Sequence, residues 1–470
     1  MTAPPLDPPL DVWRALTDVV VDRIARHHAQ LADMPARSVD GGRALAERLR
    51  ATTPSEEGRP LDALLDVLFD EALPCTFNTA SGGYLAYIPG GGLPAAALAD
   101  FIASSVNRYT GVWAAAPGLV ELEQNALRAI VTLIGLPKET AGVLTSGGSL
   151  ANLSAIVAAR HARLGDRFDD GVLYTSSEAH HSVDKAARIA GFRLDQVAKL
   201  PIDARFRVDV DALSARVSRD RAEGKRPFLV VAHAGTTNTG AVDRLADIAR
   251  VCAREDLWLH VDAAYGGFFA MTARGRDILD GIERADSITL DPHKGLFLPY
   301  GTGCLLVKDA RALEAAHDVT AAYMPASSSD PLHVDFAARS AELSRPFRGL
   351  AVWLALELHG ARAFRDALDA RIDMARDLAD RLARIDGVRV VAPPELSLFP
   401  FTIDDDGART SRALERVNAR GRVFLTSTIV HGRTLARACV LHLRTDRARI
   451  DACVEDLTRA IDDERRASST

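Results

Sequence analysis

Residues 257–295 read LWLHVDAAYGGFFAMTARGRDILDGIERADSITLDPHKG and indicate the fold class of the whole chain. Two short apolar runs, LWLHVDAA and SITLDPH, are typical of buried strands, and the amphipathic segment ILDGIERA separates them. The runs GVLYTS, FLVVAHA and GCLLVKD lie elsewhere in the middle of the chain, with the helical patterns SVDKAARIAG and LADIARVCARE among them. Strands that alternate with helices predict βαβ units and a mostly parallel sheet, so the expected fold class is α/β.

Three parts are expected in the 470-residue chain. Residues 1–75 should form a helical N-terminal arm, since DVWRALTDVVVDRIARHHAQLA and PLDALLDVLFDEAL place apolar residues near helical spacing. Such an arm has little core of its own, so its apolar faces must pack on something else, for example a second copy of the chain. Residues 76–346 should form the large α/β domain. Residues 347–470 should form a small α+β domain, because long helical patterns are followed there by short strands.

Composition argues against several classes of protein. The net charge is −6 and no basic block with interleaved aromatic residues occurs, which disfavours nucleic-acid binding. No apolar run approaches the roughly 20 residues that span a bilayer, and the opening MTAPPLDPPLDVW lacks the pattern of a signal peptide. We therefore expect a cytoplasmic protein with no nucleic-acid, membrane or metal partner. Its cysteines have no metal-ligand spacing and should be reduced thiols; they are Cys75, Cys252, Cys304, Cys439 and Cys453.

The stretch LTSGGSLANLSAIVAAR places two glycines and two serines before an apolar helical pattern. Free backbone N–H groups at a helix start attract an anion, and glycine lets the anion approach closely, so the stretch favours a phosphate site. A serine-capped helix after a glycine turn would show the same pattern. The stretch is not a P-loop, because no lysine follows the glycines.

Asp262 follows an apolar strand pattern and precedes Ala263 and Ala264. A carboxylate at the end of a strand can cap a helix, bind a metal ion or pair with a buried cation. The two alanines leave room for a flat ring against the end of the strand.

Two histidines and a lysine complete the set of candidate residues. His180 and His181 lie between a strand pattern and a helix pattern, and no further ligands stand at a spacing that suggests a metal. Lys294 follows His293 directly after a strand pattern. A lysine in a dry pocket near another cation can be driven to the neutral amine, which forms a Schiff base with an aldehyde. A lysine that reaches out to the surface is the alternative.

Together these features match the needs of pyridoxal phosphate. The cofactor requires a phosphate cradle, a carboxylate for its ring N–H, a side chain against its ring and an amine for its aldehyde. The protonated ring then accepts the electrons released when a bond to the substrate α-carbon breaks.

At these residues the sequence resembles the group II pyridoxal-phosphate decarboxylases, whose best-known members act on aromatic L-amino acids. The resemblance covers nearly the whole chain, from GGYLAYIPGGG and VWAAAPGLVELE through SEAHHSV, GTTNTGAVD, WLHVDAAYGG and DPHKG to ACVLHLRTD. It implies the fold-type-I architecture, in which helices flank a mostly parallel, seven-stranded central sheet. It also implies an obligate homodimer with the active site at the interface.

The resemblance assigns a role to each matching residue. Lys294 matches the Schiff-base lysine, Asp262 the partner of the pyridine nitrogen, and His180 the residue that stacks on the ring. Tyr323 matches a loop tyrosine that protonates the carbanion after carbon dioxide leaves. The other implied cofactor contacts are Gly148, Ser149, Thr237, Ala264 and His293, and the implied substrate contacts are Tyr87, Ile88, Gly90 and Trp113.

The sequence also departs from the aromatic-acid members of that family. Gly295 stands where many of them have tryptophan, and Gly111 where they often carry a bulky pocket residue. The leading hypothesis is nevertheless decarboxylation of an L-amino acid with an aromatic or other bulky side chain to its amine. Alternatives on the same fold are oxidative decarboxylation and deamination to an aldehyde, a carbon–carbon lyase and an aminotransferase. A non-catalytic dimeric scaffold is the alternative from another class.

Overall fold

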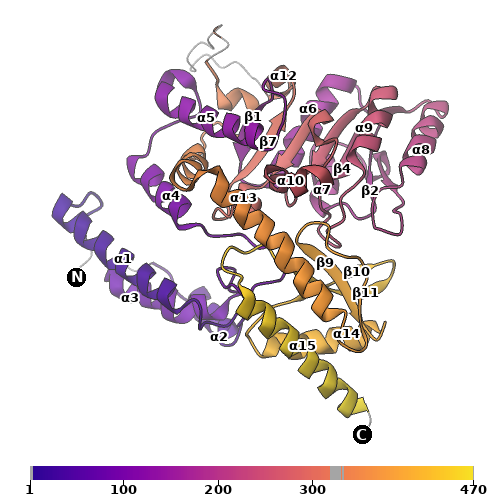
Figure 1. Cartoon of the computed structure of the whole chain (residues 1–470). Helices are drawn as coiled ribbons and strands as arrows, with labels where there is room; N and C mark the ends of the chain where they lie inside the picture. Colours follow the sequence, from indigo (N-terminus) through magenta and orange to yellow (C-terminus); the bar gives the residue numbers. More distant parts are fainter. Residues whose placement is uncertain (1–3, 55, 318–329, 331–332, 469–470) are drawn as a thin grey trace.

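A seven-stranded sheet forms the centre of the molecule (Figure 1). The computed structural model describes residues 4–54, 56–317, 330 and 333–468. The sheet has the strand order β1-β7-β6-β5-β4-β2-β3. Its strands are β1 (Ala141–Thr145), β2 (Gly171–Ser176), β3 (Val197–Leu200), β4 (Arg226–His233), β5 (Trp258–Asp262), β6 (Ser287–Leu290) and β7 (Gly303–Val307). The expectation of an α/β fold with a seven-stranded central sheet is thus confirmed.

Strand β7 is the exception to the common strand direction. It pairs antiparallel with both β1 and β6, whereas β6, β5, β4, β2 and β3 pair parallel with one another in that order. The connection from β6 to β7 contains only one helical turn, α11 (Pro292–Gly295). A parallel return needs a longer crossover, usually with a full helix, so the chain turns back beside β6 instead.

Helices cover the two faces of this sheet (Figure 1). The central one, α6 (Gly148–Leu164), contacts strands β1, β4, β5, β6 and β7. Its buried face is built from small residues such as Ala151, Ala155 and Ala158, which lets the helix lie close to the sheet. The other helices of this part are α4 (Pro94–Val106), α5 (Pro117–Leu133), α7 (His181–Ile189), α8 (Val210–Ala222), α9 (Leu245–Arg254), α10 (Ala273–Ile278) and α12 (Ala310–His317).

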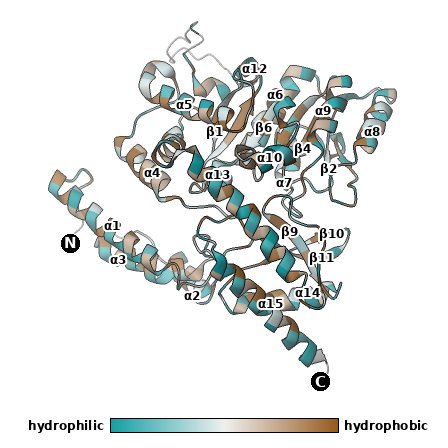
Figure 2. Ribbon diagram, in the orientation of Figure 1, coloured by the Kyte–Doolittle hydropathy of each residue, from teal (hydrophilic) through white to brown (hydrophobic). Residues whose placement is uncertain are grey.

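Hydrophobic residues concentrate along the strands and the inner sides of these helices (Figure 2). One large apolar core joins the central sheet to its covering helices, and a second, smaller core lies in the C-terminal part. Within the described ranges, no helix is both long and apolar enough to cross a membrane.

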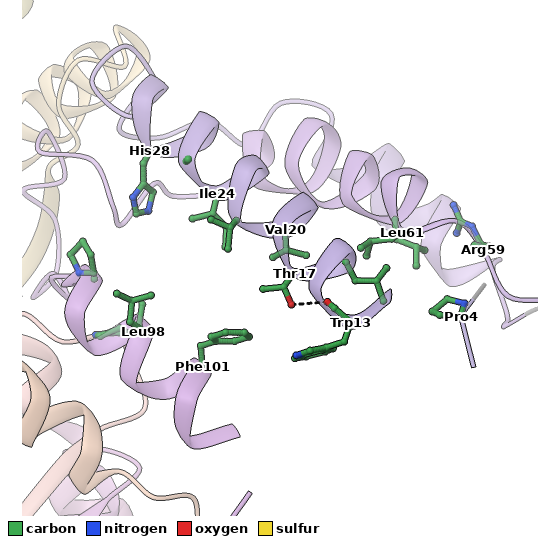
Figure 3. A pocket seen from close by; sticks show the side chains of 18 residues that line it. Pro4, Trp13, Thr17, Val20, Ile24, His28, Arg59, Leu61, Leu98 and Phe101 are labelled. Atoms are coloured by element: carbon green, nitrogen blue, oxygen red, sulfur yellow. Dashed lines mark hydrogen bonds between the residues drawn. The ribbon is translucent and has the colours of Figure 1, made fainter. Parts of the chain in front are cut away.

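The N-terminal helices form an arm that projects from the body of the molecule (Figure 1). The arm contains α1 (Leu10–Gln30), α2 (Gly42–Arg50) and α3 (Leu61–Asp66), and Arg23 of α1 pairs with Asp66 and Asp70. Although α1 has 21 residues, none of them is buried within the single chain. Between α1 and α4 lies an apolar groove of about 810 Å³ (Figure 3). Its apolar lining includes Trp13, Leu16, Val20, Ile24, Leu98 and Phe101.

The C-terminal part contains a four-stranded antiparallel sheet, with the order β10-β11-β9-β8. The long helix α13 (Gly349–Leu382) leads into it and breaks direction at Gly360, whose φ of 71° suits glycine. Before this break α13 packs on the large core, and near its C-terminal end it packs on the small one. The remaining elements are β8 (Val388–Val390), β9 (Leu398–Ile403), α14 (Gly407–Ala419), β10 (Thr426–Val430), β11 (Arg433–Cys439) and α15 (Arg447–Ser468).

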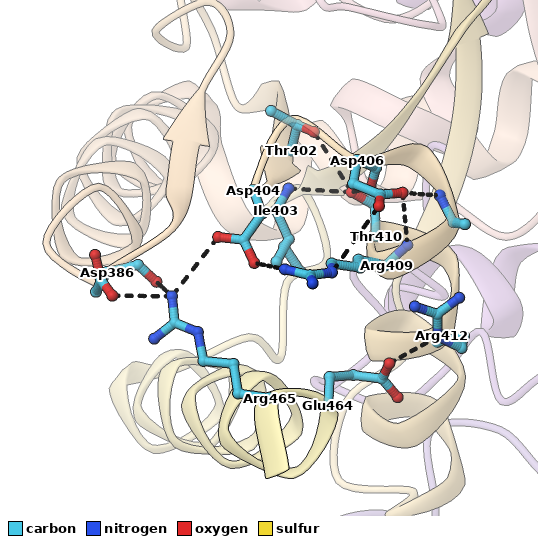
Figure 4. A network of polar contacts seen from close by, with 11 residues as sticks. Asp386, Thr402, Ile403, Asp404, Asp406, Arg409, Thr410, Arg412, Glu464 and Arg465 are labelled. Atoms are coloured by element: carbon cyan, nitrogen blue, oxygen red, sulfur yellow. Dashed lines mark hydrogen bonds and ion pairs between the residues drawn. The ribbon is translucent and has the colours of Figure 1, made fainter. Parts of the chain in front are cut away.

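Ion pairs join the last helix to α14 and to the turn before β8 (Figure 4). Glu464 of α15 accepts a hydrogen bond from Arg412 of α14 at 2.7 Å, and Arg465 lies 2.9 Å from Asp386. These pairs lie at or near the surface, where each contributes about 1 kcal/mol or less. The apolar contacts of Ala452, Leu457 and other core residues therefore provide most of the attachment of α15.

Candidate active site

A polar cavity of about 300 Å³ opens at the carboxyl ends of β4, β5 and β6. Parallel α/β sheets bind ligands at this edge, because the free ends of strands and the starts of helices meet there. Eight of the residues singled out in the sequence line this one cavity: Gly148, Ser149, His180, Thr237, Asp262, Ala264, His293 and Lys294. The fold therefore brings together side chains that are far apart in the sequence.

The start of α6 forms one wall of the cavity. Helix α6 begins at Gly148, and its first backbone N–H groups have no partner within the helix. A Cβ atom on Gly148 would lie 3.1 Å from Oδ2 of Asp291 and 3.2 Å from Cβ of Ala264. Glycine thus keeps this wall open, and the helix start can receive an anion. His293 completes the wall; its Nδ1 donates to the carbonyl of Thr302 at 2.7 Å.

Asp262 is the last residue of β5 and its carboxylate is buried. Oδ2 accepts a hydrogen bond from Nδ2 of Asn152 at 2.9 Å, and Oδ1 accepts one from the backbone N–H of Ala264 at 3.2 Å. Burial acts to raise the pKa of this carboxyl, but His233, Asn152 and His260 outweigh it and bring the pKa below its ordinary value. Asp262 is therefore ionised at neutral pH and can pair with a cationic ring N–H.

His180 caps the start of α7. Its Nδ1 accepts the backbone N–H of Ser182 at 3.3 Å and lies 2.8 Å from Oγ of the same serine. Burial lowers the pKa of His180, and the nearby His181 and Lys294 lower it further. The ring is consequently neutral at pH 7, which suits a side chain that packs against a flat aromatic ring.

Lys294 projects from α11 beside a buried carboxylate. Its Nζ lies 2.8 Å from Oδ2 of Asp291, and the side chain of Asp291 is only 3% exposed. The other oxygen of that carboxylate, Oδ1, is buried and makes no hydrogen bond to the described residues. It is therefore free to accept a hydrogen bond from water or from a bound ligand.

These features fit pyridoxal phosphate. The anion site at Gly148, the ionised Asp262, the neutral His180 and the amine of Lys294 surround one cavity large enough for a small ligand. Within the described residues, no cluster of three or more potential metal ligands occurs.

The four residues expected to contact the substrate do not line this cavity within a single chain. Gly90 comes nearest: its N–H donates to the hydroxyl of Tyr300 at 3.3 Å, beside His293. Tyr87 lies on the surface, whereas Ile88 packs in the large core. The ring of Trp113 stacks on the ring of His333, with 3.5 Å between the ring centroids and 17° between the ring planes. Tyr323 lies outside the residues that the structure describes.

Sequence reasoning did not find several residues of the site. Asp291 stands directly after β6, as Asp262 stands at the end of β5, so the same pattern could have indicated it. Asn152 and Ser182 line the cavity from within helices and carry no local signal.

Known proteins are similar to this chain in both sequence and fold. The pyridoxal-dependent decarboxylase conserved domain matches residues 77–404. The aromatic-L-amino-acid decarboxylase of Bacillus atrophaeus is 33% identical over 441 residues, which are 92% of each chain. The phenylacetaldehyde synthase of Arabidopsis thaliana is 27% identical and covers 90% of each chain. The crystal structure of Oryza sativa TDC with PLP and tryptamine superimposes with a TM-score of 0.93 at 28% identity, covering 98% of this chain and all of that one.

Proposed function

The chain belongs to the pyridoxal-dependent decarboxylases, because the conserved domain of that family matches more than half of its length, and we propose that it converts an aromatic L-amino acid to the corresponding amine. It is an enzyme that uses pyridoxal phosphate to decarboxylate amino acids. The observation that carries this conclusion is the single cavity shared by Lys294, Asp262 and His180. The aromatic substrate is supported by the relatives named above.

Each residue of the cavity has a proposed task. The amine of Lys294 binds the aldehyde carbon of the cofactor, and the ionised Asp262 holds a proton on the ring nitrogen through a charge-assisted hydrogen bond. When bound, pyridoxal phosphate accepts the electron pair of the bond broken at the substrate α-carbon. His180 packs against the ring. The phosphate contacts are Gly148, Ser149 and His293, and Thr237 and Ala264 are the further cofactor contacts.

The fate of the α-carbon decides between amine and aldehyde. Addition of a proton gives the amine, whereas reaction with oxygen and water gives the aldehyde, ammonia and hydrogen peroxide. The similarity to a phenylacetaldehyde synthase keeps the second outcome as the alternative function. The proposed proton donor is Tyr323, which the sequence resemblance suggests and which lies outside the described residues.

Replacing Tyr323 with phenylalanine tests this proton transfer, because the ring stays and the acidic proton is lost. We expect slower amine formation and a larger share of aldehyde under air. The measurement is the ratio of amine to aldehyde plus ammonia in both proteins. An unchanged ratio and rate would assign the proton to another donor.

We also propose that the protein is a homodimer with the active site at its interface. The 21-residue helix α1 buries none of its residues within one chain, and its groove against α4 is apolar (Figure 3). Helices without tertiary packing are only marginally stable in water, and exposed apolar surfaces of this kind mark protein contacts. A second copy of the chain over the groove would cover both helices.

The division of the chain and its location are further proposals. We propose an arm at residues 1–75, a large domain at 76–346 and a small domain at 347–470. A second apolar core in the C-terminal part supports a separate small domain, although α13 packs on the large core as far as Ile372. A cytoplasmic location is supported by the five free cysteines, four of them buried.

A panel of substrates tests the proposed function. The purified holoenzyme is incubated under air with L-tryptophan, L-tyrosine, L-phenylalanine and L-glutamate, and carbon dioxide, amine, aldehyde and ammonia are measured together. We expect carbon dioxide and amine in equal amounts from at least one aromatic acid. Turnover of glutamate alone would overturn the substrate class, and equal amounts of aldehyde and ammonia would favour the alternative function.

A further inference from the structure

Asn152 uses its whole side-chain amide inside the protein. It lies on α6, it is buried, and its Nδ2 donates to Oδ2 of Asp262 at 2.9 Å and to Oγ of Ser182 at 3.0 Å. Its Oδ1 accepts from Oγ1 of Thr289 at 2.7 Å and lies 3.0 Å from Nε2 of His260. An amide has two N–H groups and two acceptor positions, so every one of them has a partner.

The orientation of this amide follows from Asp262. An ionised carboxylate can only accept hydrogen bonds, so the NH2 group of Asn152 must face it. The carbonyl then faces His260, which must carry its proton on Nε2 in order to donate. The Nδ1 atom of His260 is left as an acceptor for the hydroxyl of Ser287, 2.8 Å away. That hydroxyl oxygen in turn accepts a hydrogen bond from the indole N–H of Trp258 at 2.8 Å. Every hydrogen bond from Asp262 to Trp258 therefore has one donor and one acceptor.

The same orientation determines the proton position on His180. The oxygen of Ser182 accepts one N–H of Asn152, which leaves the serine proton directed to Nδ1 of His180, 2.8 Å away. The backbone N–H of Ser182 also donates to this nitrogen. With two donors on Nδ1, the neutral ring must carry its proton on Nε2.

We propose that Asn152 is a positioning residue that couples the two sides of the cofactor site: it holds the carboxylate of Asp262 and, through Ser182, keeps the proton of His180 on Nε2. This inference rests on the proposed function, because Asp262 and His180 matter together only if one ring lies between them. The lowered pKa of Asp262 agrees with it, since the hydrogen bond from Asn152 is one of the contacts that favour the ionised carboxylate.

Two variants separate the two effects. Asn152→Leu keeps the branching at Cγ and removes all four hydrogen bonds of the amide, including those to Asp262 and Ser182. Ser182→Ala removes the hydroxyl that joins Asn152 to His180, keeps the backbone N–H that donates to Nδ1, and leaves the bond between Asn152 and Asp262. Ser154→Ala is the matched control, because this serine is buried on the same helix and lies outside the chain of hydrogen bonds.

The first measurement is the affinity of the apoenzyme for pyridoxal phosphate, followed by the absorbance of the bound cofactor. For Asn152→Leu we expect a dissociation constant about 10- to 100-fold higher, the scale for losing a hydrogen bond to a charged group. For Ser182→Ala and for the control we expect a change of about threefold or less, since Asp262 keeps its partner.

The second measurement is the tautomer of His180 in the apoenzyme, read from long-range proton–nitrogen NMR correlations and assigned with a His180→Gln variant. We expect the proton on Nε2 in wild type and in Ser154→Ala. We expect a mixture of tautomers, and a pKa of His180 moved upward, in both Ser182→Ala and Asn152→Leu.

Wild-type affinity and an Nε2 proton retained in Asn152→Leu would overturn the inference. If that variant fails to fold, an unchanged tautomer in Ser182→Ala would overturn it as well. Neither result depends on turnover, so a failure of the proposed function, seen as no carbon dioxide from any amino acid, can be told apart from a failure of this inference.

Discussion

The polar cavity at the end of the sheet and the apolar groove beside α1 differ in what lines them. The cavity has about 300 Å³ and is surrounded by carboxylates, histidines and Lys294. The groove has about 810 Å³ and is lined mainly by aliphatic and aromatic side chains (Figure 3). The groove therefore contains none of the proposed cofactor contacts, and the smaller cavity contains all of them.

This difference shows how each hollow would be used. The groups around the cavity are held by hydrogen bonds from residues such as Asn152 and Ser182, so their charges and proton positions are set before any ligand binds. Most of the groove offers apolar area without directed contacts, which suits another protein surface. The predictions below alter one hollow at a time, from the largest expected effect to the smallest.

Loss of the lysine in the cavity should have the largest effect. Lys294→Ala removes the only amine in the described lining of the cavity, so covalent attachment of the cofactor is lost. We expect turnover to fall by at least about 10³-fold, as when other covalent catalytic residues are removed. Mass spectrometry after borohydride reduction checks the attachment, and gel filtration checks that assembly is unchanged. A cofactor still reduced onto the variant protein would assign the attachment to another lysine.

Asp262→Asn should cause the second largest loss of activity, because it keeps the shape of the side chain and removes its charge. The proton on the ring nitrogen would lose its ionised partner in a buried site, which costs about 3–5 kcal/mol. Steady-state kinetics with saturating cofactor gives this value from the loss in kcat/KM. A loss of less than about tenfold would reduce Asp262 to a residue that only caps the strand end.

A substitution in the groove should weaken the association of two subunits. Leu98→Glu places a charge on a side chain that is 59% exposed in the single chain and lines the groove. If a second copy covers it, the dimer dissociation constant should rise by about 10²-fold or more, because an unpaired charge is costly in an apolar contact. Analytical ultracentrifugation measures it.

The matched control is Leu194→Glu, since Leu194 is also 59% exposed and lies outside the groove. It should leave assembly unchanged. Equal behaviour of the two variants would mean that the groove is not the contact between subunits.

His260, the buried histidine that contacts Asn152, should also impose a pH dependence on stability. Burial lowers the pKa of His260 to about 4, against 6.5 in an unfolded chain. Between these values the unfolded chain binds the extra proton, so the free energy of unfolding falls as the pH falls, by about 1.4 kcal/mol per pH unit. Below the lower value this contribution is fully lost, and above pH 6.5 it is fully present.

His260→Gln should reduce the slope by the contribution of this one histidine, because glutamine can still donate to Asn152 but does not titrate in this range. Other histidines with a lowered pKa, such as His180, keep their contributions. Urea unfolding between pH 4.5 and 7.5 measures the slope. His359→Gln, a change at an exposed histidine, is the control and should leave the slope unaltered. A slope in His260→Gln equal to that of the wild type would mean that His260 does not contribute to the proton uptake.

Some parts of the site could be read from the sequence because their signals are local. Asp262 and Lys294 follow apolar strand patterns, and His180 stands between a strand pattern and a helix pattern. In a parallel sheet all such positions meet at one edge, so their assembly into one cavity was predictable. Their roles came from the family resemblance and stay predictions.

The sequence by itself determined the α/β class and the edge at which the cavity forms, since the strand and helix periods are properties of neighbouring residues. The expectation of seven strands came from the family resemblance and not from these periods. Only the tertiary structure decided that β7 runs backward and that Asn152 joins Asp262 to Ser182. Those partners lie 110 and 30 residues away along the chain. Hydrogen bonds between distant residues depend on how the helix packs on the sheet, and no local pattern of residue types encodes that distance.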